Sequence, residues 1–274
     1  MSEFSLYKDN LNKLIEISFK AGKAIMDIYK TDFDFEKKID QSPLTAADLL
    51  SHEIISDSLS KLSPETPILS EESSQITFSE RSNWKEYWLI DPLDGTKEFI
   101  KKNGEFTTNI ALIKNNRPVF GIIHAPLLNE TYWGSKNSGS YAIYGSQAPQ
   151  KIEVSDAVRE PLKVITSRSH RSDKEQEYFD QIGHYSSISM GSSLKLCYLA
   201  SGKADIYPRF GQTSEWDIAA GDAILTFAGG KVIGKGRSEL LYNKKESFLN
   251  GSFFAIGNAK LQEDIVDHFF NILV

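Results

Sequence analysis

Three apolar runs in the middle of the chain constrain its fold more than any other feature. They read TTNIALIK (107–114), VFGIIHAP (119–126) and SYAIYG (140–145), and they are alternating or wholly apolar, as strands usually are. The letters NNRP, LLNE and KNSG that stand between them are turn-forming. Short turns join antiparallel neighbours, so this region predicts a mostly antiparallel sheet.

Helical spacing of apolar residues flanks this region. It predicts one helix over 11–29 and a second over 45–62, the latter preceded by Pro43 and followed by Pro64. The second half mixes both types: we expect strands over 162–167 and 204–209 and helices over 193–200 and about 217–227. Residues 146–160 are the best candidate for a boundary between two lobes.

Composition and charge exclude several classes of protein. The 274 residues are 40% hydrophobic with a net charge of -6, and no run of five basic residues occurs, so a long nucleic acid is not an expected partner. The polar N-terminus and the lack of an 18-residue apolar run predict no transmembrane segment and a protein that stays in the cytoplasm. The single cysteine, Cys197, lies in an apolar stretch and is expected to be a core residue.

Carboxylates gather where two short apolar strands end. Strand 68–69 is followed by Glu71, and strand 87–90 by the sequence DPLDGTKEF, which begins at Asp91 and contains Asp94. Pro92 and Gly95 favour a sharp turn there, so both side chains and the intervening Leu93 carbonyl can converge.

A cluster of acids at this turn requires a cation. Ionised carboxylates a few ångströms apart repel by an energy on the order of a few kcal/mol, and oxygen donors alone favour Mg²⁺, Mn²⁺ or Ca²⁺ over zinc. With Glu71 and with Asp217, which we expect to open a helix, four acids could hold two or three Mg²⁺ ions. The turn at Gly95-Thr96 leads into a helix, where free amides suit a phosphate oxygen.

Simpler interpretations stand beside these. An isolated Asp-Pro-x-Asp-Gly is more often an Asx-type turn with solvated carboxylates than a metal site. Lys195 and Arg209, taken alone, would be ordinary surface charges, and His170 an ordinary surface histidine.

Several motifs together resemble those of a known family. They are similar to motifs of the inositol monophosphatase superfamily of lithium-sensitive, Mg²⁺-dependent phosphatases. In chain order these motifs read LSEES, WLIDPLDGTKEFI and WDIAAGDAIL. The continuation KEF (97–99) and the later SRSH, GSSLK and YPRFG resemble its CysQ-type 3'(2'),5'-bisphosphate nucleotidases. The resemblance spans about residues 5–257.

The resemblance implies roles for individual residues. Catalytic residues would be Asp48, Thr96 and Glu71, with Asp48 and Thr96 orienting and deprotonating the attacking water. Metal ligands would be Glu71, Asp91, the Leu93 carbonyl, Asp94 and Asp217. Substrate contacts would come from Glu71, Leu93, Asp94, Gly95, Thr96, His170, Ser192, Lys195, Arg209 and Asp217.

The resemblance also implies a fold and a reaction. The fold would be an α/β (layered α+β) sandwich of alternating α-β-α-β-α layers, with an N-terminal α+β lobe (1–150) that carries most metal ligands and a C-terminal α/β lobe (151–274). The reaction would be hydrolysis of 3'(2')-phosphoadenosine 5'-phosphate by metal-activated water, in the nucleotide turnover of sulfur assimilation. An inositol or sugar monophosphatase with the same metal core is the alternative, and a catalytically inactive sensor is a third. A monomer or homodimer, and peripheral contact with a membrane, are left open.

Overall fold

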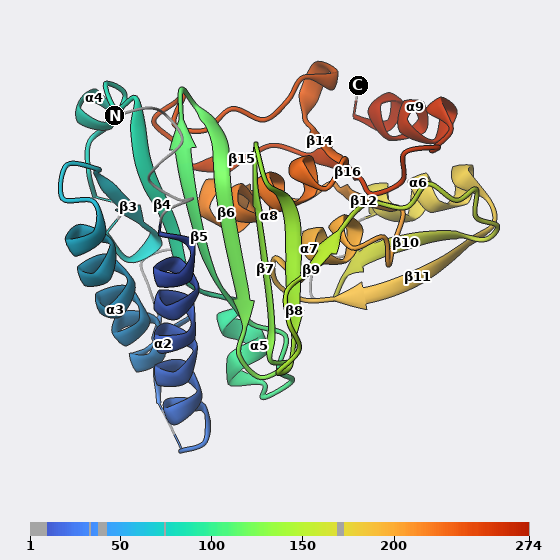
Figure 1. The fold of residues 1–274 in the computed structure, drawn as a ribbon. Helices are drawn as coiled ribbons and strands as arrows, with labels where there is room; N and C mark the ends of the chain where they lie inside the picture. Colours follow the sequence, from blue (N-terminus) through green and yellow to red (C-terminus); the bar gives the residue numbers. More distant parts are fainter. Residues whose placement is uncertain (1–9, 33, 38–42, 74, 169–172, 274) are drawn as a thin grey trace.

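The computed structural model describes residues 10–32, 34–37, 43–73, 75–168 and 173–273 of the chain. Layers of helices and sheets alternate through the molecule (Figure 1). Two sheets of seven and five strands form the β layers, with helices outside both and between them. The α-β-α-β-α sandwich expected from the resemblance is therefore confirmed.

The larger sheet contains the predicted antiparallel region. Every neighbouring pair in it is antiparallel except the first, which is parallel. Its order is β3 (Ile68–Ser70), β4 (Glu86–Asp94), β5 (Thr107–Lys114), β6 (Arg117–Ala125), β7 (Glu130–Ser135), β8 (Gly139–Tyr144) and β9 (Gln150–Ile152).

The smaller sheet belongs to the second half of the chain. β10 pairs in parallel with both of its neighbours, and β16 pairs antiparallel with both of its own. The order is β11 (Tyr185–Met190), β10 (Leu162–Ser167), β12 (Ile206–Arg209), β16 (Phe253–Ile256) and β14 (Lys231–Ile233).

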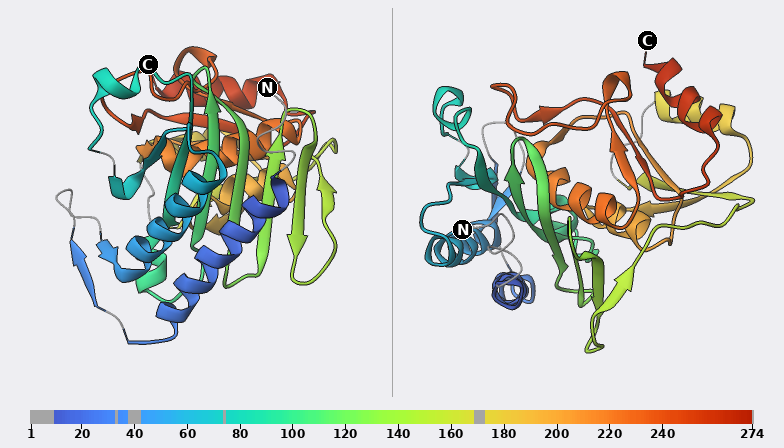
Figure 2. Two further views of the ribbon diagram at one scale, coloured as in Figure 1. Left: turned by 60° about the vertical axis from the view of Figure 1, so that its left-hand side comes forward. Right: turned by 45° about the horizontal axis from the view of Figure 1, so that its top comes forward.

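Helices cover both sheets and fill the space between them, as Figure 2 shows from two sides. α2 (Leu11–Tyr29) and α3 (Ala46–Leu62) cover the outer face of the large sheet. α7 (Leu194–Ala200) and α8 (Glu215–Phe227) lie between the sheets, and α6 (Asp173–Ile182) and α9 (Glu263–Ile272) cover the outer face of the small sheet. Each of these three interfaces has its own hydrophobic cluster.

The apolar run of β4 follows from this layering. Tyr87 and Leu89 pack toward the central helices, whereas Trp88 and Ile90 pack toward α2 and α3. Successive side chains of a strand point to opposite faces, so a strand covered on both sides is apolar throughout rather than alternating.

Two glycines allow α8 to approach the large sheet closely. Gly121 and Gly134 are cross-strand partners on β6 and β7. A Cβ atom at Gly121 would lie 2.3 Å from the carbonyl oxygen of Ala220, and one at Gly134 would lie 2.9 Å from the Cα of Ile224. Larger residues would push α8, which carries Asp217, away from the sheet.

The predicted helices and strands are confirmed with small shifts at their ends. The predicted helix 45–62 begins one residue later, because Thr45 is its N-cap. The predicted helix 217–227 begins two residues earlier, at Glu215. The lobe boundary stays a prediction, although β9 (150–152) still belongs to the large sheet.

One expectation was wrong. The carboxylates of DPLDG were expected just past the end of a strand, but β4 continues through Asp94, which pairs with Thr107. Pro92 has no N–H to offer a neighbouring strand, and the register shifts between Asp91 and Asp94 so that the intervening residues bulge.

Short elements complete the described chain. They are β1 (Phe35–Lys37) paired with β2 (Pro43–Thr45), η1 (Glu71–Ser73), α4 (Phe78–Arg81), α5 (Thr96–Ile100), η2 (Lys235–Arg237), and β13 (Thr213–Ser214) paired with β15 (Leu249–Asn250). Among the described helices, none combines the length and the apolar character that crossing a bilayer requires.

Candidate functional site

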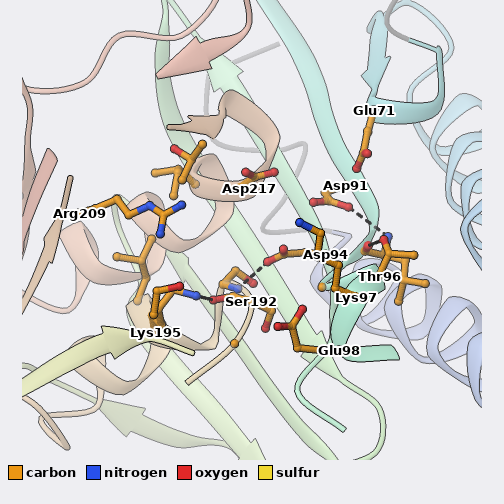
Figure 3. A pocket seen from close by; sticks show the side chains of 18 of the residues that line it. Glu71, Asp91, Asp94, Thr96, Lys97, Glu98, Ser192, Lys195, Arg209 and Asp217 are labelled. Atoms are coloured by element: carbon orange, nitrogen blue, oxygen red, sulfur yellow. Dashed lines mark hydrogen bonds between the residues drawn. The ribbon is translucent and has the colours of Figure 1, made fainter. Parts of the chain in front are cut away.

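A cavity of about 250 Å³ brings together residues from both halves of the chain (Figure 3). Ten of the residues predicted from the sequence line it: Glu71, Asp91, Leu93, Asp94, Gly95, Thr96, Ser192, Lys195, Arg209 and Asp217. Asp48 does not line the cavity but lies buried behind Thr96. His170 lies outside the described residues.

The bulge in β4 is fixed by hydrogen bonds on both sides. The Leu93 amide donates to Asp91 Oδ1 at 3.1 Å, and Ser51 Oγ of α3 donates to the carbonyl of Pro92 at 2.7 Å. Leu93 and Phe99, the apolar residues of the motif, pack in a small core cluster beneath it. The Asx-type turn of the simpler interpretation is thus present, but Asp91 is 1% exposed, so its carboxylate is not solvated.

The same local device orients two of the acids. Asp48 is the third residue of α3 and accepts from the amide of its N-cap, Thr45, at 2.7 Å. Asp217 holds the same position in α8 and accepts from the Ser214 amide at 2.8 Å. In each capping box Oδ2 binds the helix N-terminus, which leaves Oδ1 to face other groups.

Three carboxylates form a tight group. Oxygens of Asp91, Asp94 and Asp217 lie within 4.8 Å of one another. Glu71 extends toward Asp91 from η1 (Figure 3). At that separation an ionised pair repels by about 3 kcal/mol in a medium of intermediate effective dielectric.

Burial and this repulsion shift the acids toward their neutral forms. Burial raises the pKa of Asp91 well above its ordinary value, and the charges of Glu71 and Asp94 raise it further. Burial likewise raises the pKa of Asp217, with Asp94 as the next cause. For Asp94, burial raises the pKa while Lys195 and the Ser193 amide oppose the increase.

The donor set fits a hard divalent cation. The group contains carboxylates only, with no histidine or cysteine among its members, and oxygen ligands are those that Mg²⁺, Mn²⁺ and Ca²⁺ prefer. No lysine or arginine of the described chain forms an ion pair with Asp91, Asp94 or Asp217. Positive charge from a bound ion would therefore relieve a repulsion that the described side chains leave largely uncompensated.

The turn after β4 exposes its backbone to the cavity. Gly95 has φ 89° and is the N-cap of α5, a left-handed conformation that suits glycine. A Cβ atom there would lie 2.9 Å from the carbonyl oxygen of Glu105, so there is no room for a side chain either. This confirms the predicted glycine turn into a helix.

Thr96 lies between two acceptors. Its Oγ1 is 3.2 Å from Asp48 Oδ1 and 3.2 Å from the Leu93 carbonyl oxygen. A hydroxyl has one proton, so it can donate to only one of them at a time. When it does so, its lone pairs remain able to accept a hydrogen bond from a molecule in the cavity.

The opposite wall of the cavity is cationic. Burial lowers the pKa of Lys195 to about 8 although the charge of Asp94 opposes this, and its ammonium donates to the Ser192 carbonyl at 2.5 Å. Arg209 is 8% exposed, and its Nη2 donates to the Gln212 carbonyl at 2.9 Å. Arg209 Nε is buried with no hydrogen-bond partner in the described structure. The surface-charge interpretation of both residues is wrong.

Sequence reasoning missed part of this environment. Ser193 donates its amide to Asp94 Oδ2 at 2.5 Å, and its hydroxyl donates to Asn109 Oδ1 at 2.8 Å. Tyr207 lines the cavity, and the Lys195 ammonium lies over its ring at 5.7 Å from the centroid. The capping-box spacings Thr-x-x-Asp and Ser-x-x-Asp, at Thr45 and Ser214, were a signal that could have linked Asp48 with Asp217.

A second cavity of about 620 Å³ lies between the β5–β6 hairpin, the end of α8 and β14. Its rim carries several cations, but three of them are already paired within the chain: Lys114 with Glu86, Arg117 with Glu239, and Arg237 with Asp267. None of the predicted site residues lines it.

Comparison with known proteins gives a consistent result. The model of the inositol monophosphatase family matches residues 8–270. The 3'(2'),5'-bisphosphate nucleotidase CysQ of Salmonella typhimurium is 46% identical over 245 residues, which cover 89% of this chain and 98% of that protein.

Solved structures agree. The crystal structure of CysQ from Bacteroides thetaiotaomicron is similar with a TM-score of 0.82 and 39% identity, covering 93% of this chain and 99% of the other. An IMPase of Thermotoga maritima has a TM-score of 0.79 and 25% identity, covering 97% and 98%. The fold is shared with both, and the sequence is more similar to the first.

Proposed function

The chain belongs to the inositol monophosphatase family, and we propose that it is a 3'(2'),5'-bisphosphate nucleotidase that hydrolyses 3'(2')-phosphoadenosine 5'-phosphate to AMP and phosphate. The observation that carries the proposal is a single cavity with three clustered carboxylates on one wall and Lys195 and Arg209 on the other. Its relatives named CysQ, at 46% and 39% identity, favour a nucleotide over an inositol or sugar phosphate.

We propose that Mg²⁺, as two or three ions, is the metal of this site. Asp91, Asp94 and Asp217 would hold the ions together with Glu71 and the Leu93 carbonyl. When bound, Mg²⁺ supplies positive charge to the phosphoryl oxygens and lowers the pKa of water that it coordinates.

Asp48 and Thr96 are proposed to prepare the attacking water. If Thr96 donates its hydroxyl proton to Asp48 Oδ1, its oxygen can accept a hydrogen bond from a water molecule in the cavity. The capping box fixes Asp48, because Oδ2 accepts from both the amide and the hydroxyl of Thr45. This rigid pair would orient the water and pass its proton toward Asp48.

The amides of Gly95 and Thr96 would bind the phosphate that is cleaved, since both residues line the cavity at the left-handed turn into α5. A bisphosphate carries about four negative charges at neutral pH, so the second phosphate needs its own donors. We propose that Lys195, Arg209 and Ser192 supply them, because all three line the cavity and Arg209 Nε is buried with no hydrogen-bond partner among the described residues.

A direct attack by water is favoured over a covalent intermediate. Cys197 is fully buried in the core, and burial raises the pKa of its thiol well above the ordinary value. The hydroxyl of Thr96 is already hydrogen-bonded to Asp48, and the clustered carboxylates would be occupied as metal ligands in the proposed site.

The test is phosphate release with Mg²⁺ from four substrates: 3'-phosphoadenosine 5'-phosphate, adenosine 3'-monophosphate, inositol 1-phosphate and fructose 1,6-bisphosphate. We expect kcat/KM for the first to exceed the others at least 100-fold, which is worth about 2.7 kcal/mol. A preference for inositol 1-phosphate or fructose 1,6-bisphosphate would instead establish the alternative.

A pair of variants locates the preference in this cavity. Arg209→Gln should lower kcat/KM for the bisphosphate at least tenfold and change adenosine 3'-monophosphate hydrolysis much less. Arg117→Gln, a change at an exposed arginine paired with Glu239, is the matched control and should leave both substrates unaffected.

A further inference from the structure

One carboxylate outside the acid cluster joins three segments of the chain, two of which line the cavity. Glu105 precedes β5, and its Oε2 accepts from the Gly191 amide at 2.7 Å. The same oxygen accepts from Arg168 Nε at 2.7 Å, while Oε1 accepts from Arg168 Nη2 at 2.6 Å. Arg168 also donates to the Ser189 carbonyl of β11 at 3.0 Å, so its guanidinium joins Glu105 to the end of that strand.

The Gly191–Ser193 segment is attached at its two ends to different parts of the N-terminal half. At one end Gly191 is bound to Glu105. At the other, Ser193 is bound through its amide to Asp94 and through its hydroxyl to Asn109. Ser192, between them, has φ 48°, which is unusual for a residue with a side chain.

Ser192 in turn fixes the cation of the opposite wall. Its carbonyl accepts from Lys195 Nζ at 2.5 Å, and its side chain lines the cavity. The position of Ser192 and Lys195 relative to the acid cluster therefore depends on both attachments. The Ser193 attachment is made to Asp94 of the acid cluster and to Asn109 of β5, whereas Glu105 holds the Gly191 end from outside the cluster.

Packing leaves little freedom at this junction. A Cβ atom on Gly191 would lie 3.1 Å from Glu105 Oε2 and 2.9 Å from the Cγ of Glu98. The Glu105 carbonyl lies against Gly95 from the other side. One residue thus contacts both the turn proposed for the cleaved phosphate and the loop proposed for the distal one.

We propose that Glu105 is a positioning residue that sets the distance between the two phosphate subsites and so determines the preference for a bisphosphate over a monophosphate. It does not line the cavity and acts through Gly191 and Ser192. The inference rests on the proposed function, because it assigns the distal phosphate to Ser192 and Lys195.

Glu105→Gln is the decisive variant. In the wild type three N–H donors share the two carboxylate oxygens of Glu105, whereas the glutamine amide has the same shape but only one acceptor oxygen. We expect kcat/KM for 3'-phosphoadenosine 5'-phosphate to fall at least 20-fold, mainly through KM. Hydrolysis of adenosine 3'-monophosphate, which has the same cleaved phosphate and no distal one, should stay within threefold of wild type.

Two further variants sharpen the test. Arg168→Gln keeps the bond from Gly191 to Glu105 and should lower the bisphosphate preference in the same direction but only about threefold. Glu86→Gln removes another partly exposed carboxylate, which forms an ion pair with Lys114 at 3.2 Å and does not line the cavity. It should leave the hydrolysis of both substrates unchanged.

Equal losses with both substrates, or no loss with either, would overturn the inference. A wild-type enzyme with no bisphosphate preference would refute the proposed function instead. Amide hydrogen exchange gives an independent readout that needs no substrate: Glu105→Gln should speed exchange at residues 190–192, while Glu86→Gln should not. Unchanged exchange in this segment would also refute the positioning role.

Discussion

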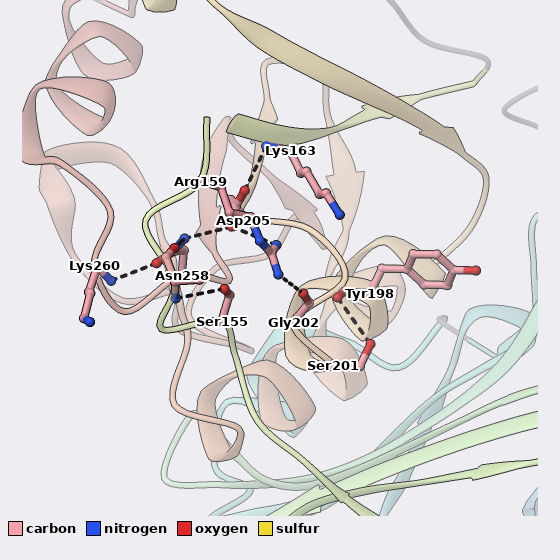
Figure 4. A network of polar contacts seen from close by, with 10 residues as sticks. Ser155, Arg159, Lys163, Tyr198, Ser201, Gly202, Asp205, Asn258 and Lys260 are labelled. Atoms are coloured by element: carbon pink, nitrogen blue, oxygen red, sulfur yellow. Dashed lines mark hydrogen bonds and ion pairs between the residues drawn. The ribbon is translucent and has the colours of Figure 1, made fainter. Parts of the chain in front are cut away.

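Two groups of buried carboxylates in this molecule are stabilised in opposite ways. Asp205, fully buried between β10, β12 and the chain near Asn258, is surrounded by donors (Figure 4). Arg159 Nη1 donates to it at 3.1 Å, the Lys163 amide at 2.8 Å and Asn258 Nδ2 at 2.8 Å. A positive charge and two neutral donors from the chain itself balance this one carboxylate.

The cavity cluster is arranged differently. Asp91, Asp94 and Asp217 each accept one backbone amide, from Leu93, Ser193 and Ser214 respectively. No ion pair with a described residue compensates them, and their pKa values are raised. An acid compensated by the chain's own charges is a structural joint, whereas a deficit of positive charge is what the proposed metal site requires.

Asp222, on the central helix α8, is intermediate. It accepts from two hydroxyls, Tyr242 Oη at 2.8 Å and Thr226 Oγ1 at 3.1 Å, and from no lysine or arginine within the described part of the chain. The three environments therefore form a series. The charge of Asp205 is compensated by a cation, that of Asp222 by the dipoles of two hydroxyls, and that of the cavity cluster by too few groups of either kind. Substituting one acid from each tests whether this series governs stability and activity.

The largest effect is expected at the cluster. Asp94→Asn removes a charge that metal binding needs, so kcat/KM for Mg²⁺-dependent phosphate release should fall at least 1000-fold, about 4 kcal/mol. In EDTA the variant should be at least as stable as wild type, because one of three mutually repelling carboxylates is gone. Phosphate release and urea unfolding in EDTA measure the two effects.

The dependence of protein stability on Mg²⁺ provides the control. Mg²⁺ at about 100 times its Kd should stabilise wild type by about 2.7 kcal/mol, and Asp94→Asn should lose most of that gain. Activity within tenfold of wild type, or an undiminished Mg²⁺ stabilisation, would count against the metal site as proposed.

A smaller effect, on stability and not on chemistry, is expected at Asp205. Asp205→Asn leaves the half-buried Arg159 beside a neutral group and turns an amide donor toward N–H groups in a fully buried position, which should lower the free energy of unfolding by about 3 kcal/mol. Urea unfolding measures this loss, while kcat at low temperature should stay near wild type. The Mg²⁺ stabilisation should be unchanged.

The matched control is Glu153→Gln. Glu153 pairs with Lys151, but its side chain is 66% exposed, so the loss should be under about 0.5 kcal/mol. If Asp205→Asn were equally mild, the contrast between a balanced acid and the cluster would have no energetic basis.

The same contrast explains what could be predicted from the sequence. The cluster was found because its signals are local: Asp91 and Asp94 lie three residues apart, around a proline and before a glycine. The Asp205 joint has no such signal, since its partners Arg159 and Asn258 are 46 and 53 residues away. Glu105 was missed for the same reason, with Arg168 63 residues distant.

Fold predictions divide along the same line. The helix over 11–29 and the antiparallel strands follow from spacing within one element, and both are confirmed. The layer order came only from the family resemblance, because it depends on which faces meet. The wrong strand end at Asp91 has a physical cause: Pro92 usually ends a strand, but here Ser51 of α3 hydrogen-bonds the bulged carbonyl and pairing resumes at Asp94.

The smallest effect is expected at Asp222. Burial raises its pKa to about 6, so between its ordinary value and pH 6 the folded state binds a proton that the unfolded state has lost. Wild-type stability from this group therefore falls as pH rises through that window and is level above it. Asp222→Asn lacks the titration, so its stability relative to wild type should rise by about 2 kcal/mol between pH 4.5 and 7, within a ceiling of about 3 kcal/mol.

Urea unfolding of both proteins in parallel measures that difference and cancels the titration of His124, whose pKa burial lowers to about 4. A flat difference would mean that two hydroxyls balance a buried carboxylate as well as Arg159 balances Asp205, and the series would reduce to two classes.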